Sequence, residues 1–520
     1  METLASYLSQ TWVTGNGPTA TLINPATEQT VALSCTRGLD FAGALHLARS
    51  QGAANLQRLT FAQRGAILRR LAETVVFHRK ELIRLSTVNN GATRSDSKFD
   101  VDGASFTLQA YADLGETLGD RRYLVDGDPE ELLRSKRLAG LHIRTPRHGV
   151  AVHINAFNFP AWGLAEKFAV AFLAGMPVVT KPATSTCLTA YHLAKAFVDT
   201  GVLPPHTFGF IAGSAGNLIE HLQFGDALAF TGSGGLGMRF KQELSPKGIA
   251  VNVEADSLNA AILGPDVGSS DETWNLFIRD VFRDMSQKTG QKCTAIRRVL
   301  VPTEMVEEVT EALVDLASRL KIGNPANDDV RMGPVVSAQQ NEDVGQGLDR
   351  LEQQVTKVHG NGRPANLIDV DADKGYFFDV HLFRAADQAA SLAADAVHEH
   401  EVFGPAATIL PYDGRPESAT RIIALGGGGL VASSYSNDRR FQKDLVLGMA
   451  PYHGRITMGS EKIAASAPGP GTVLPQLVHG GPGRAGGGEE LGGHRGLEFY
   501  LQRTAIQGYR PLVEKLFDGS

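Results

Sequence analysis

The chain has 520 residues, 42% of them hydrophobic and 20% charged, a composition typical of globular proteins and long enough for several domains. The net charge of −6 argues against nucleic acid as a partner, because no basic excess is present to neutralise phosphates. The longest apolar run, 168–179, is too short to span a bilayer, and three cysteines are too few for a disulfide framework, so we expect a cytoplasmic protein without membrane contact.

Residues 38–120 have apolar residues at helical spacing and are expected to form helices that flank a sheet. Between 147 and 240, apolar strands alternate with helices, which implies right-handed crossovers and a parallel sheet covered on both faces. In this doubly wound α/β unit, Pro160 suits the first turn of a helix and Gly175 its end. The expected strands are 149–154, 176–181, 207–211 and 227–230, and the expected helices are 160–174, 186–199 and 214–222.

Downstream, the pattern predicts a second α/β region that extends to about residue 460. The polar segment 355–374 is expected to be a surface loop, and the glycines at 426–429 and between 480 and 493 indicate loops or tight turns. The first elements expected in this region are a helix at 274–285, a strand at 297–301 and a helix at 305–320.

The segment Gly232-Ser-Gly-Gly-Leu-Gly237 matches the G-x-G-x-x-G pattern between an expected strand and a helical stretch. In that context it indicates phosphate binding by backbone N–H groups, and the alternative is a strand-to-helix turn without a ligand. In a standard dinucleotide fold, an acid about 20 residues further on holds the ribose, and Glu254 occupies that place.

Cys293 follows an expected helix in the segment Gly290-Gln-Lys-Cys293, where a turn could expose its sulfur. A thiolate there would be a strong nucleophile once its pKa is lowered. A lone cysteine is more often an inert core residue, which is what we expect of Cys35 and Cys187.

Several further motifs accompany these residues: Asn158-Phe-Pro160, Lys181-Pro-Ala183, Phe230-Thr-Gly-Ser233, Leu320-Lys-Ile-Gly-Asn-Pro325, Met332-Gly-Pro334 and Glu401-Val-Phe-Gly-Pro405. Together with Glu254 and Cys293, and in this order, they resemble the aldehyde dehydrogenase superfamily over about residues 20–510. Each motif alone is weak, but the ordered set is specific.

The resemblance implies an aldehyde dehydrogenase-like α/β fold with doubly wound parallel sheets in two domains. A cofactor-binding domain would comprise 1–125 and 147–257, and a catalytic domain 258–480. An oligomerisation element would join 126–146 to 481–520, and a homodimer is expected.

The resemblance also implies catalytic roles. Cys293 would attack the aldehyde carbon, with the Asn158 amide and the Cys293 backbone N–H stabilising the oxyanion. Glu254 would activate the water that hydrolyses the thioester, a role that competes with ribose binding. Lys167 and Glu490 resemble a pair that relays the proton outward, although Glu489 is adjacent to Glu490.

For the cofactor, the resemblance places Lys181 at the adenosine ribose. NAD-preferring relatives commonly carry Glu three residues after that lysine, where this chain has Thr184. Because Thr184 removes a repulsion against a 2′-phosphate, NADP is expected to be preferred over NAD. No metal is expected. The other implied cofactor contacts are Ser233 at the pyrophosphate, Glu401 at the nicotinamide ribose and Phe403 beside the nicotinamide ring.

Three strings, 155–163, 253–259 and 290–298, resemble a narrower branch of the family. That branch oxidises semialdehydes carried on coenzyme A (CoA) thioesters in aerobic aromatic degradation, and it includes part of a phenylacetate-degradation fusion protein. The partner expected is therefore a small CoA-linked aldehyde. Candidates for the CoA phosphates are the basic residues of Arg134-Ser-Lys-Arg137 and Arg144, with a solvated charged face as the alternative.

Other functions stay open. One is the oxidation of free medium-chain aldehydes, and another is a cysteine hydrolase or thioesterase without a redox step. The hydrolase would need a base such as histidine near Cys293, and the sequence identifies none. A non-catalytic member of the fold would be expected to lack Cys293 or Glu254. A CoA-acylating enzyme is disfavoured because Glu254 favours attack by water.

Overall fold

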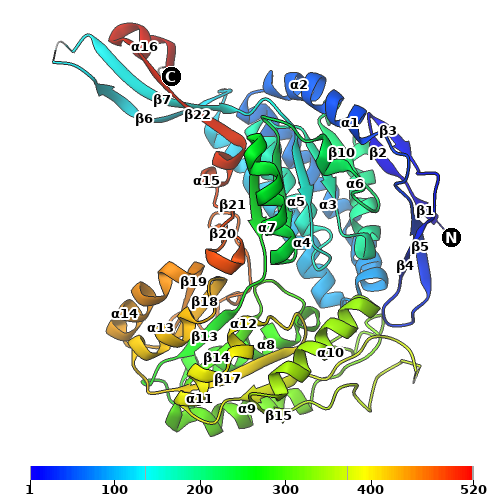
Figure 1. Ribbon diagram of the computed structural model, residues 1–520, viewed down its shortest axis with the longest axis vertical. Helices are drawn as coiled ribbons and strands as arrows, with labels where there is room; N and C mark the ends of the chain where they lie inside the picture. The colour runs from blue at the N-terminus through cyan, green and yellow to red at the C-terminus, as the bar shows by residue number, and fades with distance from the viewer. Residues whose placement is uncertain (1, 135, 372, 518–520) are drawn as a thin grey trace.

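Figure 1 shows the computed structural model, which describes residues 2–134, 136–371 and 373–517. The chain builds two seven-stranded sheets, each covered by helices, that lie one above the other in this view. This confirms the α/β class predicted from the sequence. The strand order of the first sheet is β12 (Ala250–Glu254), β11 (Ala227–Thr231), β8 (Ala151–Ile154), β9 (Val178–Lys181), β10 (Phe208–Phe210), β2 (Ser6–Leu8), β3 (Thr11–Val13).

The strands from β12 to β10 are parallel, as the alternation of strands and helices predicts. The far edge of this sheet is antiparallel: Tyr7 of β2 pairs antiparallel with Phe210 of β10, and β3 pairs antiparallel with β2. Ser9 and Gln10 connect β2 to β3 with positive φ angles of 50° and 67°, as a two-residue hairpin turn of this hand requires. Ser-Gln is not the usual sequence for such a turn, so the hairpin escaped prediction.

Helices cover both faces of the first sheet, as predicted. The helix α5 (Trp162–Ala174) is buried almost all round and begins two residues later than predicted. Its start is fixed by Asp100, whose carboxylate accepts hydrogen bonds from the backbone N–H groups of Ala161 and Trp162. It ends at Gly175, whose φ of 101° suits glycine. The expected helix at 214–222 is only a 3₁₀ turn, Leu218–His221.

The other helices of this half are α1 (Phe41–Leu47), α2 (Ala53–Gln57), α3 (Phe61–Asn90), α4 (Arg94–Leu118), α6 (Cys187–Asp199) and α7 (Gly234–Leu244). A small sheet of β1 (Glu2–Leu4), β5 (Thr30–Ser34) and β4 (Ala20–Ile23) lies near the N-terminus. Within the described part of the chain, no helix is both long and apolar enough to cross a membrane.

The second sheet is parallel except for its edge strand β15, which runs antiparallel to β16. The predicted loop at 355–374 is therefore wrong at its start, where Thr356–His359 forms β15 on the sheet edge; residue 372 of that loop lies outside the described residues. The order is β15 (Thr356–His359), β16 (His381–Arg384), β17 (Ala406–Tyr412), β14 (Ile296–Pro302), β13 (Asn259–Leu263), β18 (Gly429–Tyr435), β19 (His453–Gly459). The helices are α8 (Glu272–Ser286), α9 (Val306–Ser318), α10 (Ala338–Glu352), α11 (Gln388–Ala393), α12 (Asp395–Glu399), α13 (Pro416–Ala424) and α14 (Arg439–Met449).

A third sheet projects from the body of the molecule (Figure 1). It consists of β6 (Leu124–Glu131), β7 (Leu138–Pro146) and β22 (Leu501–Tyr509), followed by α16 (Arg510–Phe517). The two segments expected to form an oligomerisation element thus pair with each other, with β7 and β22 antiparallel along their length. The domain boundaries, the role of this sheet and the homodimer stay predictions, and residues 1 and 518–520 of the expected segments lie outside the described residues.

The glycine-rich tail folds into a hairpin of β20 (Val478–Gly480) and β21 (Glu489–Leu491), followed by α15 (His494–Leu497). Its glycines allow close backbone approaches: a Cβ on Gly480 would lie 2.0 Å from the Gly488 carbonyl oxygen. The Gly488 N–H donates to the Val253 carbonyl on β12. The tail is therefore tightly packed, and it reaches the end of the first sheet where Glu254 lies.

Candidate active site

Cys293 lies in a loop between α8 and β14, preceded by three residues in the left-handed region. Lys288 and Thr289 have φ angles of 52° and 57°, a conformation that costs about 1–3 kcal/mol per residue and persists only where the surroundings enforce it. The Lys288 N–H donates to the Asp96 carboxylate, and the Thr289 hydroxyl donates to the Gly333 carbonyl. The loop is thus held in a strained shape that leaves the cysteine partly exposed.

Asn259 fixes the other side of this loop. Its Nδ2 donates to the carbonyls of Cys293 at 2.8 Å and Ala295 at 2.9 Å. Its Oδ1 accepts from the Ser257 hydroxyl at 2.6 Å. Asn259 and Ser257 belong to the string 253–259, so that string supplies a brace for the nucleophile loop.

Three ionisable side chains meet at the sulfur. The ligand atoms of Glu254, Cys293 and His479 all lie within 4.8 Å of one another. Glu254 is buried at the end of β12, and its Oε1 forms an ion pair with His479 Nε2 at 3.2 Å. Thiolate, imidazole and carboxylate are also donors that Zn²⁺ accepts, so the expected absence of a metal stays a prediction and assays need a chelator.

The three groups perturb one another's protonation. Burial and the nearby Glu254 charge raise the pKa of the Cys293 thiol well above its usual value. Burial alone would raise the pKa of the Glu254 carboxyl too, but the facing His479 and Lys167 outweigh it and lower that pKa. Burial would lower the pKa of His479, yet Glu254 raises it. The free chain therefore favours a neutral thiol beside an ionised pair.

The predicted relay pair is in contact. Lys167 Nζ lies 2.9 Å from Glu490 Oε2 and 3.3 Å from Glu166 Oε1, and these three side chains lie close to Glu254. Burial raises the pKa of Glu490 to about 7, although Lys167 opposes the shift. A carboxyl with a pKa near neutrality is suited to passing protons. Glu489, the alternative to Glu490, is exposed and lies on the opposite face of β21.

Neither His479 nor Glu166 was predicted from the sequence. No histidine was expected near Cys293, whereas the structure places His479 there through the β20–β21 hairpin, in which His479 pairs with Glu490. The available signal was a histidine and a glutamate on either side of a glycine-rich turn. Glu166 is adjacent to Lys167 on α5, and its side chain lines the pocket beside Cys293.

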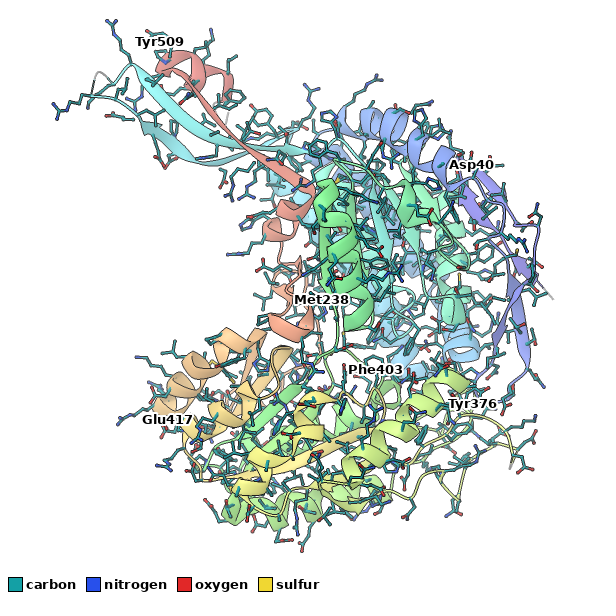
Figure 2. The ribbon with its side chains drawn as sticks, in the orientation of Figure 1. Asp40, Met238, Tyr376, Phe403, Glu417 and Tyr509 are labelled. Carbon is teal, nitrogen blue, oxygen red and sulfur yellow. The ribbon has the colours of Figure 1, made fainter. Side chains whose placement is uncertain are left out.

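A cavity of about 600 Å³ opens on one side of Cys293, between the two sheets. Asn158 and Glu254 line both this cavity and the small pocket on the other side of the sulfur. Glu401 also lines the cavity; it pairs with Arg297 at 3.4 Å, and burial raises its pKa to about 7. Phe403, labelled in Figure 2 where the two halves of the molecule meet, is another of its walls. These are the residues expected at the nicotinamide end of a cofactor.

The residues of the Gly232–Gly237 motif have different roles in the structure. Gly232 and Ser233 line the cavity, and a Cβ on Gly235 would meet open space. Gly237 instead allows α7 to pack closely on β12, since a Cβ there would lie 2.5 Å from Val253. At the start of α7 the Gly234 N–H donates to the Asp256 carboxylate at 3.2 Å. Asp256 thus engages one donor that a phosphate would use.

Lys181 ends β9, and Thr184 begins the 3₁₀ turn that precedes α6. Between them, Ala183 lines the cavity. Among the described residues, no carboxylate lies within ion-pair distance of Lys181 Nζ, so its positive charge has no acidic partner. Burial lowers the pKa of Lys181. A phosphate ester would supply the missing negative charge.

Comparison with known proteins decides the family, because the model of the aldehyde dehydrogenase family matches residues 12–506. This chain belongs to the aldehyde dehydrogenase family. The dehydrogenase is 40% identical to the 3,4-dehydroadipyl-CoA semialdehyde dehydrogenase of Aromatoleum evansii over 92% of this chain and 93% of that protein. It is 39% identical to Protein MaoC of Klebsiella aerogenes over 34% of this chain and 50% of that protein.

The fold agrees with this assignment. A structure of betaine aldehyde dehydrogenase from Staphylococcus aureus in complex with NAD⁺ superposes with a TM-score of 0.83 at 23% identity, over 97% of this chain and 95% of that chain. The dehydrogenase-like fold inferred from the sequence is therefore confirmed. As a member of its family, the dehydrogenase is a nicotinamide-dependent oxidoreductase of aldehydes.

The His479–Glu254 pair makes a prediction for the dehydrogenase. His479→Asn removes the charge that holds the pKa of Glu254 down, so burial should raise that pKa. Because the carboxylate must be ionised to act as a base, we expect the acidic limb of the kcat–pH profile to move upward by about one to three pH units. The measurement is kcat between pH 5 and 9, with His381→Asn as a buried control on β16. Superimposable profiles for the two variants would contradict the coupling.

Proposed function

We propose that the dehydrogenase oxidises a semialdehyde carried on CoA, specifically 3,4-dehydroadipyl-CoA semialdehyde, to the corresponding acid with NADP. The main support for this substrate is the 40% identity with the Aromatoleum evansii enzyme over nearly the full length of both chains. The strings 155–163, 253–259 and 290–298 point to the same branch.

In the first half of the reaction, the Cys293 thiol, whose pKa is raised in the free chain, gives up its proton to bulk water, which its partial exposure allows. The thiolate then attacks the aldehyde carbon and gives a thiohemiacetal. The Asn158 amide and the Cys293 backbone N–H donate to its oxyanion, where the negative charge develops. The nicotinamide cofactor supplies the hydride acceptor when it is bound in the cavity that Glu401 and Phe403 line. Loss of the hydride leaves a thioester on Cys293.

In the second half, Glu254 accepts a proton from water, and the water oxygen attacks the thioester carbon. The C–S bond breaks, the thiolate of Cys293 leaves, and the acid is released with its original CoA still attached. Lys167 and Glu490 carry the proton away from Glu254, which their contact at 2.9 Å supports. The ionised Glu254 favours water over a second CoA as the attacking group.

The preference for NADP rests on Thr184 and the lone charge of Lys181. Thr184→Glu places a carboxylate where it repels a 2′-phosphate, so we expect the NADP/NAD ratio of kcat/KM to fall about tenfold or more. Steady-state kinetics with both cofactors measure the ratio. Ser185→Glu, on the next residue of the same turn, is the matched control. An unchanged ratio in Thr184→Glu would overturn this explanation.

The decisive experiment for the substrate compares a CoA-linked semialdehyde with free aldehydes of equal chain length. We expect a large kcat/KM advantage for the CoA-linked form in reduced-cofactor production at 340 nm. Equal or better turnover of the free aldehydes would leave the proposed reaction mechanism intact but would contradict the proposal that the substrate is linked to CoA. Absence of reduced cofactor with either substrate would favour the hydrolase alternative.

A further inference from the structure

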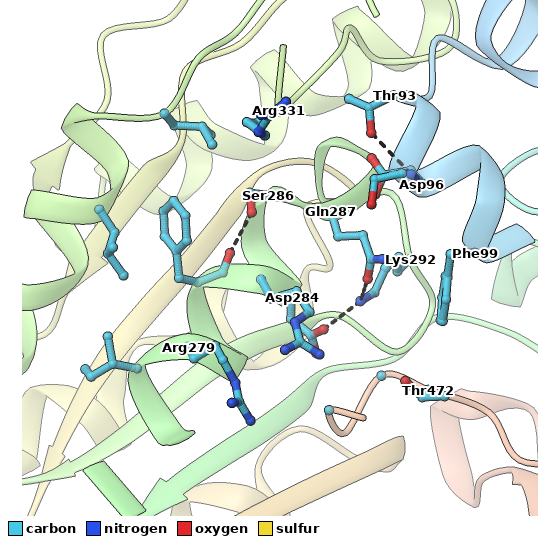
Figure 3. A pocket seen from close by; sticks show the side chains of 18 of the residues that line it. Thr93, Asp96, Phe99, Arg279, Asp284, Ser286, Gln287, Lys292, Arg331 and Thr472 are labelled. Atoms are coloured by element: carbon cyan, nitrogen blue, oxygen red, sulfur yellow. Dashed lines mark hydrogen bonds and ion pairs between the residues drawn. The ribbon is translucent and has the colours of Figure 1, made fainter. Parts of the chain in front are cut away.

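A second large cavity, of about 1170 Å³, shares no lining residue with the cavity that Glu401 and Phe403 line, and Figure 3 shows side chains of its wall. Its walls come mainly from α4, α8, α9 and the segments 327–331 and 468–472. It shares Phe99 and Gly471 with the pocket that contains Cys293, which itself holds only about 40 Å³. A substrate that reaches the sulfur from this side therefore passes Phe99 and Gly471.

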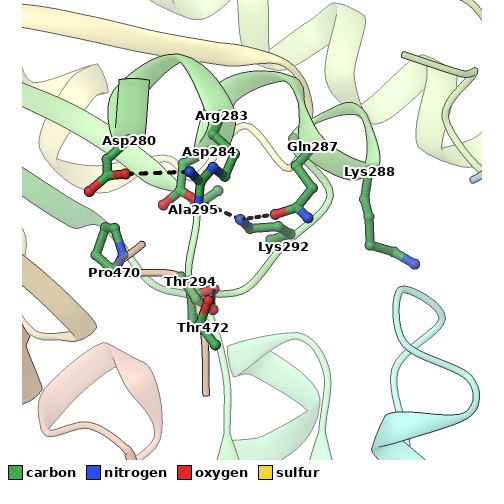
Figure 4. Close-up of polar contacts among 12 residues, drawn as sticks. Asp280, Arg283, Asp284, Gln287, Lys288, Lys292, Thr294, Ala295, Pro470 and Thr472 are labelled. Atoms are coloured by element: carbon green, nitrogen blue, oxygen red, sulfur yellow. Dashed lines mark hydrogen bonds and ion pairs between the residues drawn. The ribbon is translucent and has the colours of Figure 1, made fainter. Parts of the chain in front are cut away.

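The cavity wall is rich in positive charge. Its carboxylates are largely engaged: Asp284 pairs with Lys292 at 2.6 Å (Figure 4), Asp328 faces Arg94 at 3.6 Å, and Asp96 accepts the Lys288 backbone N–H. Asp315, the remaining acid, pairs with Arg319 outside the cavity. The six cationic residues of the wall are Arg94, Lys98, Arg279, Arg283, Lys292 and Arg331.

Among the described residues, four of these cations have no ion pair with a carboxylate of the cavity wall: Arg279, Arg283, Lys98 and Arg331, which donates to the Asp328 and Val330 carbonyls. Arg279 and Arg283 lie one turn apart on α8. Their ion-pair partner is the buried Asp280, whose Oδ1 lies 3.5 Å from Arg279 Nε and 3.9 Å from a terminal nitrogen of Arg283. Arg279 also donates to the Ala464 carbonyl, and Arg283 to the Pro468 carbonyl. Lys98 is exposed on α4 across the cavity and has no ion pair among the described residues. The apolar side chains of Ile278 and Phe282 lie on the same helix as the two arginines and also line the cavity. Cations beside apolar surface suit a phosphorylated nucleotide.

The passage between the two spaces is narrow and aromatic. Phe99 packs edge-on against Phe159 and Trp162, with ring centroids 6.0 and 5.2 Å away. Opposite, Gly471 leaves no room for a side chain, since a Cβ there would lie 2.8 Å from Lys292 Nζ and 2.9 Å from Asp284. The slender β-alanine and cysteamine end of a pantetheine arm suits this passage better than the bulky nucleotide of CoA does.

We infer that this cavity binds the 3′-phosphorylated ADP part of CoA, with Arg279, Arg283 and Lys98 at its phosphates, while the pantetheine arm passes Phe99 and Gly471 to bring the aldehyde to Cys293. The inference deepens the proposed function and rests on it. It replaces the basic residues predicted for the CoA phosphates, because Arg134, Lys136, Arg137 and Arg144 line neither this cavity nor the pocket of Cys293. Arg144 instead pairs with Asp126 and Glu498 on the projecting sheet region.

The test compares two substrates that differ only in the nucleotide: the semialdehyde as its CoA thioester and as its pantetheine thioester. In the wild type, the CoA form should have the lower KM, and the difference should shrink with added salt. Lys98→Glu and Arg279→Glu, tested separately, should each raise KM for the CoA form about tenfold and leave the pantetheine form within about twofold. Arg439→Glu, at an exposed arginine on α14, is the matched control.

The outcomes separate the inference from the function on which it rests. An advantage of the CoA form that both charge reversals leave intact would overturn the nucleotide site and keep the proposed substrate. Equal KM values for the CoA and pantetheine thioesters in the wild type, both far below the KM for free aldehyde, would also overturn the nucleotide site and keep the proposed substrate. If free aldehyde equals the CoA form, the proposed substrate and the nucleotide site both fail.

Discussion

Cys293→Ala is expected to lower the rate of reduced-cofactor formation by at least about a thousandfold, because Cys293 is the only thiol among the described residues that lines the pocket and can form the thiohemiacetal. The measurement is absorbance at 340 nm with saturating aldehyde and cofactor, together with the intact mass of the protein during turnover. In the wild type, the mass should show an acyl adduct that the variant lacks.

Cys35→Ser is the matched control for that experiment. Cys35 is buried, and its sulfur accepts a hydrogen bond from the Gly17 N–H, which a hydroxyl can replace. This variant should keep near wild-type activity. Redox turnover that survives in Cys293→Ala would rule out the nucleophile assigned here.

Glu254→Gln should separate the two halves of the reaction. With the base removed, we expect a burst of reduced cofactor close to one per site, followed by a steady rate about 10²–10⁴-fold below wild type as acyl-enzyme accumulates. Rapid mixing resolves the burst, and quenched samples report acid release. The variant should also lower the pKa of His479, which loses the carboxylate that raises it.

The same variant decides between the two functions that the sequence allowed for Glu254. A ribose ligand would give a higher cofactor KM and normal release of acid in a single turnover. The contacts of Glu254 with His479 and its position beside Cys293 favour the base. Glu243→Gln, an exposed residue on α7, controls for the loss of a carboxylate.

Much of the fold follows from local patterns. The strands β8, β9 and β11 and the helix α6 were predictable because each is long enough to show its own periodicity and ends at a recognisable residue. The hairpin of β2 and β3 was not, since its turn uses Ser9 and Gln10 and its pairing partner Phe210 is remote in sequence. The start of α5 also escaped, because Asp100 on another helix fixes it.

The site was predictable to the extent that its residues lie in motifs. Cys293, Glu254 and Asn158 each belong to a recognisable segment, and the structure brings all three to the same pocket. The glycine-rich turn after His479 is its one local signal, and only the packing of the tail brings its side chain to Glu254. The cationic cavity could not be predicted for the same reason, because Lys98 and Arg279 come from helices that are adjacent only in the folded chain.

The dependence of the site on the tail hairpin has a consequence for biosynthesis. Lys167 and its partner Glu490 are 323 residues apart in sequence. Chains emerge from the ribosome N-terminus first, so the sheet that carries Glu254 and the loop that carries Cys293 are synthesised before either His479 or Glu490 exists. The thiol therefore stays without its full proton-transfer apparatus until translation is nearly finished. Catalytic competence therefore arrives as one of the last events of folding.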